Sequence, residues 1–171
     1  MPVHPSAGNY ENTLANGIAW YFAKKGEDFV YRCINRLDRD TSGLTIVAKH
    51  AVSAAILGQM VRAKAEQGLK APGIHRTYLA FVEGKVVPVS GVIDAPIARK
   101  EDRCLRRVVD FKRGDRAVTH YRVLTGWQTG SAQKFRSLVK LQLETGRTHQ
   151  IRVHMAYLGH PLVGDFLYNP A

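Results

Sequence analysis

A single aspartate, Asp38, stands in a charged segment between two apolar runs. The segment 35–43 has the sequence NRLDRDTSG, and the runs on either side, 30–34 and 44–48, are predicted to be strands. A carboxylate held in a loop between two buried strands could act as a nucleophile. An isolated pattern of this kind is more typical of a surface turn, in which Asp, Thr and Ser side chains bond their own backbone and Gly43 supplies a positive φ.

Two later residues, Tyr78 and Arg147, stand in or beside predicted secondary-structure elements and could also take part in chemistry. Residues 76–83 predict a strand whose side chains alternate between two faces, with Leu79 and Phe81 on one and Tyr78, Ala80 and Val82 on the other. On composition alone, Tyr78 is expected to be a core aromatic with its hydroxyl satisfied. Arg147 stands just before a predicted helix, where a cation opposes the helix dipole. We therefore expect Arg147 to have an anionic partner, because a guanidinium holds a carboxylate through two donors.

The elements that must position these residues follow from the hydrophobic pattern. A helix is predicted over 13–23 and another over 52–68, which should pack on the sheet with Lys64 on its solvated side. A third helix should be capped by Thr148 or Thr145, run to about residue 158, and stop at Gly159. Further strands are predicted at 92–97, 117–124 and 135–143, the last two forming an antiparallel hairpin around 126–131.

Three histidines near the end of the chain raise the question of a metal site. His149, His154 and His160 follow no His-Glu-x-x-His pattern, and no fourth ligand stands in register with them. We therefore expect hydrogen-bonded structural histidines and no bound metal. Cys33 and Cys104 form no Cys-x-x-Cys pair and are interpreted as ordinary thiols.

Three segments together resemble the motifs of the RluA-type pseudouridine synthases. The sequence RLDRDTSG at 36–43 resembles the family's signature, and RTYLAFVEG at 76–84 resembles its second motif. The third resemblance is ETGRTHQIR at 144–152, continuing into GHPLVGD at 159–165. The similarity extends over nearly the whole chain, from residue 2 to residue 168, although Asn35 stands where the family more often has histidine.

This resemblance implies a role for each candidate residue. In the family the aspartate matching Asp38 is the catalytic nucleophile, and the arginine matching Arg147 pairs with it. The tyrosine matching Tyr78 lies against the target uracil, and an aromatic ring with a polar tip suits stacking on an extruded base. Arg36 would take the place of the departed base. The remaining expected substrate contacts are Thr41, Leu162 and Val163, the last two as an apolar wall.

The chain is strongly basic. It has 25 Lys and Arg against 14 Asp and Glu, a net charge of +11, which implies a polyanionic partner such as nucleic acid. The stretch 99–116 is especially rich in charge, and loops at this place grip RNA in the resembling family. The residues expected to contact the RNA backbone are Arg99, Lys100, Arg103, Arg106 and Arg107.

Length and composition favour a single globular domain over residues 1–171. Its expected class is α+β, with a mixed, mainly antiparallel sheet flanked by helices and loops, and both ends look short beside the family. No apolar run of membrane-spanning length and no leader pattern appear, so a cytoplasmic protein with no membrane partner and no obligate protein partner is expected.

The predicted function is a cofactor-free isomerisation of uridine to pseudouridine in RNA. Ribosomal RNA of the large subunit is the preferred substrate, and transfer RNA is the alternative. A catalytically silent or truncated RNA-binding relative is a second hypothesis. A glycosidase that uses Asp38 and Asp40 as its carboxylate pair is a third, but neutral sugars give no reason for a charge of +11.

Overall fold

The computed structural model describes residues 1–6, 8–100, 106–130 and 134–170. Its packing forms two compact units, one of residues 1–63 with 72–74 and one of residues 64–71 with 75–171. The expectation of a single domain stays a prediction. In the described parts of the chain no helix has the length and apolar character needed to cross a membrane.

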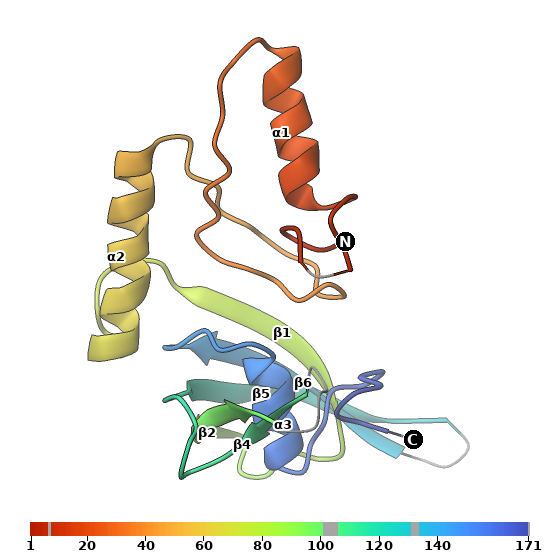
Figure 1. The fold of residues 1–171 in the computed structure, drawn as a ribbon. Helices are drawn as coiled ribbons and strands as arrows, with labels where there is room; N and C mark the ends of the chain where they lie inside the picture. The colour runs from red at the N-terminus through yellow and green to blue at the C-terminus, as the bar shows by residue number, and fades with distance from the viewer. Residues whose placement is uncertain (7, 101–105, 131–133, 171) are drawn as a thin grey trace. The chain divides into compact units, whose positions relative to one another are not determined.

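The second unit is built on a four-stranded sheet. Its strands lie in the order β1 (Arg76–Glu83), β6 (Lys134–Leu143), β5 (Val118–Thr129) and β2 (Ser90–Asp94), and every neighbouring pair is antiparallel (Figure 1). Helix α3 (Gln150–Tyr157) contributes Met155 to the core of this sheet. The structure thus confirms an α+β fold, with purely antiparallel pairing among the described strands.

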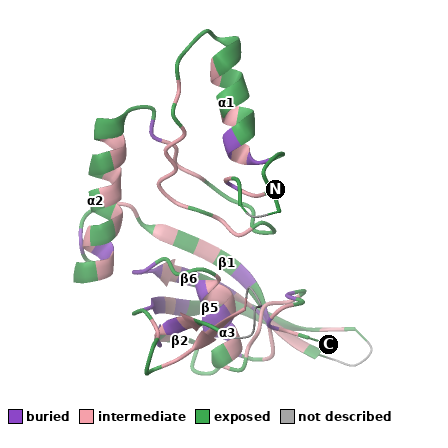
Figure 2. Ribbon diagram, viewed as in Figure 1, coloured by how far each residue is buried: buried purple, intermediate pink, exposed green. Residues whose placement is uncertain are grey.

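The core of the sheet follows the alternation of the strands. In β1, Ala80 and Val82 are buried, whereas Leu79 and Phe81, which alternate with them along the strand, are exposed. Val139 and Leu141 of β6 are fully buried beside them, as Figure 2 shows for the central strands. The predicted alternation of side chains between two faces is therefore confirmed, and the structure shows that the face with Ala80 and Val82 lies on the core.

Two strands differ from the prediction in their bounds. β5 continues to Thr129 and pairs with β6 as far as Lys134, so most of the expected turn at 126–131 is strand. The strand expected at 92–97 ends at Asp94, and after Pro96 the chain starts β3 (Ile97–Arg99), which pairs with β4 (Arg107–Val109). Proline has no backbone N–H to donate to a ladder, which explains the interruption.

Helix α3 begins differently from the prediction. Neither Thr145 nor Thr148 caps it; the residue before the helix is His149, in a left-handed conformation with φ of 57° and no side-chain capping bond. The Thr145 hydroxyl instead bonds Val118 and Gln150 within the unit. The end of the helix is as expected, since Gly159 has φ of 85°.

The first unit contains α1 (Leu14–Lys24), and α2 (Ala51–Gln67) begins in it. α1 starts with a capping box, in which Thr13 and Asn16 bond each other's backbone N–H. The predicted strands around Asp38 are not regular strands, because only Cys33 and Val47 form a bridge. The apolar residues Val52, Ile56 and Met60 of α2 are exposed, and its packing on the sheet stays a prediction.

One residue of α2 is placed opposite to the prediction. Lys64 is fully buried, not solvated. Its ammonium group donates to the carbonyl of Leu69 at 3.0 Å and lies 2.9 Å from the ring of His75. A long charged side chain can be buried when its head group finds such partners, and local periodicity does not reveal them.

Candidate active site

The loop that carries Asp38 is held closed by the side chain of Asn35. Its amide donates to the carbonyl of Leu44 at 2.9 Å, and its Oδ1 accepts from the N–H of Ile46 at 2.8 Å. Within the loop, the N–H of Thr41 donates to the carbonyl of Asp38 at 3.0 Å. Asn35 thus acts as a clamp across the base of the loop, a role that the sequence did not suggest.

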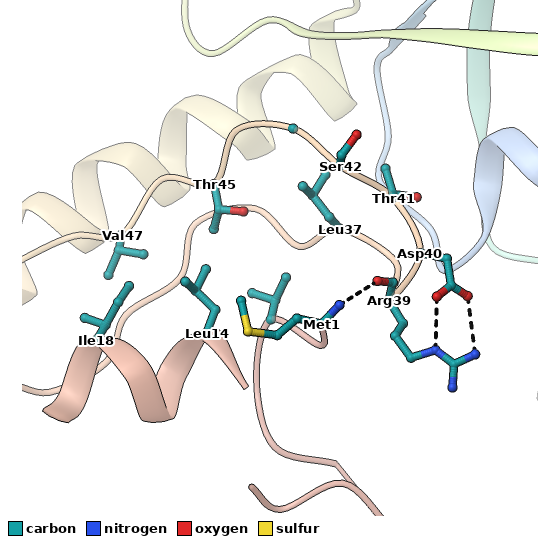
Figure 3. A pocket seen from close by; sticks show the side chains of 12 residues that line it. Met1, Leu14, Ile18, Leu37, Arg39, Asp40, Thr41, Ser42, Thr45 and Val47 are labelled. Carbon is teal, nitrogen blue, oxygen red and sulfur yellow. Dashed lines mark hydrogen bonds and ion pairs between the residues drawn. The ribbon is translucent and has the colours of Figure 1, made fainter. Parts of the chain in front are cut away.

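Side chains on this loop differ in exposure. Asp38 is half-buried, whereas Arg36 and Thr41 are exposed. Gly43 has φ of 146°, as the turn interpretation predicted. Asp40 faces solvent and pairs with the adjacent Arg39 at 3.3 Å (Figure 3).

A hollow of about 770 Å³ lies beside the loop within the first unit. Figure 3 shows Leu14 and Ile18 of α1 on one side of it and Val47 across from them. The segment 39–43 forms its polar rim. The hollow therefore combines an apolar floor with hydroxyl and charged groups.

In the second unit, the expected apolar wall runs along β1. The N–H of Glu83 donates to the carbonyl of Pro161, and the N–H of Val163 donates to the carbonyl of Phe81, both at 2.9 Å. Leu162 packs against the same core cluster as the half-buried Tyr78. The structure therefore brings Tyr78, Leu162 and Val163 to one strand of the sheet.

Arg147 is held through its backbone and its Nε. Its N–H donates to Oε1 of Gln150 at 2.9 Å, and its Nε donates to the carbonyl of Arg116 at 3.0 Å. In the same unit a carboxylate, that of Asp115, lies 3.8 Å from Nη1, but both side chains are substantially exposed, so the pair is weak. Asp38 belongs to the other unit, and its pairing with Arg147 stays a prediction.

The acidic residue of the 144–152 motif, Glu144, is bonded to two basic side chains. Glu144 accepts from Arg116 at 3.0 Å and lies 2.7 Å from Nε2 of His120. Burial alone would raise the pKa of Glu144, but the hydrogen bonds from His120 and Arg116 outweigh it and hold the pKa below its ordinary value. Glu144 is therefore a stable anion that keeps Arg116, and through it Arg147, in place.

The remaining polar residues of the segment 144–154 bond the protein itself. His149 lies 2.8 Å from the hydroxyl of Tyr168, and Arg152 makes two bonds to Asp165, at 2.7 and 2.9 Å. His154 is fully buried between the Thr119 hydroxyl and the carbonyl of Ala95.

The structure confirms the expectation of hydrogen-bonded histidines, since His160 also bonds the carbonyl of Glu83. The anchoring roles of Gln150 and Arg152 were not predicted. Gln150 and His154 are four positions apart, which places both on one face of the helix and could have indicated the role of Gln150, but no such spacing indicates Arg152.

Three of the expected RNA contacts meet at a basic hollow of about 510 Å³. Arg99, Lys100 and Arg107 line it together with Arg113 and one acidic residue, Asp115. Arg106 is not among the residues that line this hollow, and its guanidinium lies 5.8 Å from the ring centre of Tyr168. Arg103 lies outside the described residues.

The first unit holds a braced aspartate loop, and the second unit has an antiparallel sheet, helix α3 and a basic hollow. Residues 1–157 match the family of RNA pseudouridylate synthases. The chain belongs to this family.

Relatives and solved structures agree with this assignment. The chain is 45% identical to "Uncharacterized RNA pseudouridine synthase YhcT" of Bacillus subtilis, over 98% of this chain and 51% of that protein. It is 43% identical to "Ribosomal large subunit pseudouridine synthase D" of Zymomonas mobilis, over 98% of this chain and 50% of that protein. The chain thus spans about half the length of these relatives.

The structure of "Human RNA Pseudouridylate Synthase Domain Containing 1" superposes with a TM-score of 0.72 at 27% identity, over 93% of this chain and 61% of the human chain. That of "Human RNA Pseudouridylate Synthase Domain Containing 4" gives 0.68 at 26% identity, over 99% and 62%. The fold is therefore that of pseudouridylate synthase domains.

Proposed function

We propose that this chain isomerises uridine to pseudouridine in RNA, with Asp38 as the nucleophile. The observation that carries the proposal is the family match over residues 1–157, which includes Asp38, Tyr78 and Arg147. In this reaction the bond from the uracil nitrogen to the ribose breaks, the base rotates, and a new bond forms from a ring carbon to the same ribose carbon. The ring carbon gives up its hydrogen as a proton, the freed ring nitrogen takes up a proton, and no electrons leave or enter.

The proposed roles follow from side-chain chemistry. A carboxylate attacks only when it is ionised, and removal from water disfavours the charge, so pairing with Arg147 would keep Asp38 charged. Tyr78 would stack on the extruded base and accept the final proton, with Leu162 and Val163 as the apolar wall. On the Asp38 loop, Arg36 would fill the gap left in the RNA stack.

We further propose large-subunit ribosomal RNA as the substrate, in the cytoplasm. Support comes from relatives in Zymomonas mobilis and Vibrio cholerae that are named ribosomal large subunit pseudouridine synthase D. The basic hollow at Arg99, Lys100 and Arg107 suits phosphate groups, which would position an RNA without selecting its sequence. Thr41, exposed on the loop, would contact the target nucleotide.

The test is release of tritium from RNA labelled at carbon 5 of uridine. Asp38→Asn should lower the rate on the order of 10⁴-fold while RNA affinity stays close to that of the wild type, because an amide keeps the shape but cannot attack. Equal rates for the two proteins would refute the assignment of Asp38.

The matched control is Asp40→Asn, because Asp40 is on the same loop but is exposed and pairs with Arg39. It should retain full activity, whereas a glycosidase with a carboxylate pair would lose it. Transcripts of large-subunit ribosomal RNA and of transfer RNA should be compared. Release from transfer RNA alone would change the substrate but not the reaction. Binding without release from either would favour the silent relative.

A further inference from the structure

A buried chain of hydrogen bonds runs beneath the turn that carries Arg147. Its four side chains are almost inaccessible, with exposed fractions of 2% for Thr145, 3% for Gln150, 0% for Thr119 and 0% for His154. They come from β5, α3 and the turn before α3. Polar groups buried this deeply are costly unless each one is bonded.

The direction of every bond in this chain can be assigned. The backbone N–H of Arg147 can only donate, and the carbonyl of Val118 can only accept. Gln150 must therefore turn its Oε1 to Arg147 and its Nε2 to Val118, at 2.9 and 3.0 Å. Nε2 also donates to the hydroxyl of Thr119 at 2.9 Å. The hydroxyl of Thr145, which accepts from the N–H of Val118, donates to Oε1 at 2.8 Å.

The far end of the chain fixes the tautomer of His154. Its Nε2 must donate to the carbonyl of Ala95 at 2.9 Å, which leaves Nδ1 to accept from the hydroxyl of Thr119 at 2.8 Å. Burial lowers the pKa of His154, and a neutral ring has the one donor and one acceptor that these bonds need. All donors then point the same way, from Thr145 through Gln150 and Thr119 to His154 and Ala95.

We propose that Gln150 is a positioning residue for Arg147, with its amide orientation set by Thr119 and His154. The amide of Gln150 bonds the backbone of Arg147 directly, and the guanidinium is then aimed by the bond from Nε to the carbonyl of Arg116. The inference rests on the proposed function, in which Arg147 is the partner of the nucleophile. A cooperative, fully bonded network restricts the turn to one arrangement, which is what a precisely placed cation requires.

The structural part is tested by NMR, without reference to activity. The nitrogen shifts of His154 should show a protonated Nε2 and an unprotonated Nδ1. In Gln150→Leu, the backbone amide of Arg147 loses its acceptor, and its hydrogen exchange should be at least about tenfold faster. In Thr119→Val, which keeps the shape but removes the relaying hydroxyl, exchange at Arg147 should rise by a smaller factor.

The catalytic part is tested by tritium release with the same variants. Gln150→Leu should lower kcat by roughly 10-fold to 100-fold with little change in KM, because a cation displaced by about 1 Å impairs the chemical step more than RNA binding. The matched control is Ser137→Ala, which removes another buried hydroxyl of the sheet, one that donates to the carbonyl of Gly84 at 2.9 Å. It should lower thermal stability as much as Thr119→Val does but leave kcat unchanged.

The outcomes separate the two proposals. The opposite tautomer of His154, or an Arg147 amide unaffected in both variants, would overturn the positioning role whatever the activity. Loss of kcat to the same extent in Ser137→Ala would also overturn it, because the effect would then be general destabilisation. A faster-exchanging Arg147 amide in the variants, together with a wild-type protein that releases no tritium, would support the positioning and refute the proposed function.

Discussion

At the scale of single residues, the polar side chains of the segment 144–154 divide by where they find partners. Arg147 keeps a side chain that is 42% exposed, whereas Glu144 is 11% exposed and bonded to Arg116 and His120. Arg152 and Asp165 form a pair with exposed fractions of 18% and 5%. Of Glu144, Arg147 and Arg152, Arg147 has the most exposed side chain and is therefore the best placed of the three to meet a substrate.

Replacing Asp165 by asparagine should destabilise the protein by about 3 kcal/mol. The change leaves the guanidinium of Arg152 largely buried without its anion, and it also weakens the bonds that Asp165 accepts from the N–H groups of Leu167 and Tyr168. Urea unfolding at pH 7 would measure the loss. The exposed pair provides the control, since Asp40→Asn should change stability by less than about 0.5 kcal/mol.

The same residue predicts a pH dependence. Burial alone would raise the pKa of Asp165, but bonds from Arg152 and from two backbone N–H groups outweigh it and place the pKa below its ordinary value of 3.8. A lowered folded pKa means that the stabilisation is complete above the unfolded value and is lost as the pH falls through the folded value. Asp165→Asn should therefore show a shallower loss of stability below about pH 4 than the wild type, and an equal slope would contradict this account.

At the scale of elements, the turn 110–114 sets the geometry of the basic hollow. Asp110 accepts from the N–H groups of Lys112 and Arg113 at 2.9 and 3.1 Å, and Gly114 donates to the carbonyl of Asp110 at 2.8 Å. The turn then delivers Asp115 to its bridge with Ile97. Arg113 and Asp115 of the hollow are placed by this backbone, and Arg99 and Arg107 by the β3–β4 pair.

Gly114→Ala should destabilise the protein by about 1–3 kcal/mol. A Cβ at Gly114 would overlap the carbonyl oxygen of Asp110 and lie 2.7 Å from the backbone of Pro96, and neither of these groups can rotate away as a side chain could. Thermal or urea unfolding would measure the effect. Gly17→Ala is the matched control, because that site is open and lies within α1, so alanine should stabilise by about 0.5–1 kcal/mol. Stabilisation by both changes would show that the packing at Gly114 is looser than described.

At the scale of the whole molecule, the net charge of +11 and the position of the cations make separate contributions to RNA binding. Excess charge alone attracts any polyanion over a distance set by salt. A hollow lined by several cations adds contacts with individual phosphates, each of which releases counterions. The two contributions can be separated by changing which cations are removed.

Replacing Arg99, Lys100 and Arg107 together by glutamine should weaken RNA binding and make it less sensitive to salt. The slope of log affinity against log salt should fall by about 1 for each phosphate that the variant no longer neutralises. Filter binding or fluorescence anisotropy over a series of salt concentrations would measure both. A triple change at Lys24, Lys25 and Lys49 removes the same charge from the first unit and should reduce the slope less. Equal effects would mean that net charge, not the hollow, governs binding.

The sequence predicted local features of the fold well where one period dominates. β1 has the predicted bounds and the predicted alternation, and α1 falls within one residue of its predicted range. The prediction was wrong where a long-range partner outweighs the local pattern. The buried ammonium group of Lys64 has the carbonyl of Leu69 and the ring of His75 as hydrogen-bond partners. The expected helix cap Thr145 bonds the N–H of Val118 instead.

The candidate site shows the same division. Motif resemblance indicated Asp38, Tyr78 and Arg147, with Leu162 and Val163 as an apolar wall, and the structure adds that the segment with Leu162 and Val163 pairs with β1. Motif spacing did not reveal the clamp of Asn35 or the buried chain through Gln150. Both depend on which backbone groups lack a partner, and only the folded chain determines that.

By itself the sequence determined the approximate positions of α1, α2 and α3 and of the strands of the four-stranded sheet, the excess of positive charge, and the three motifs that carry the candidate chemistry. These are local properties, set by side-chain type and spacing along the chain. The tertiary structure alone decided which polar residues of those motifs are buried anchors and which face outward. The bond from His154 to Ala95 joins residues 59 positions apart, and such partners become neighbours only when β2, β5 and α3 pack together.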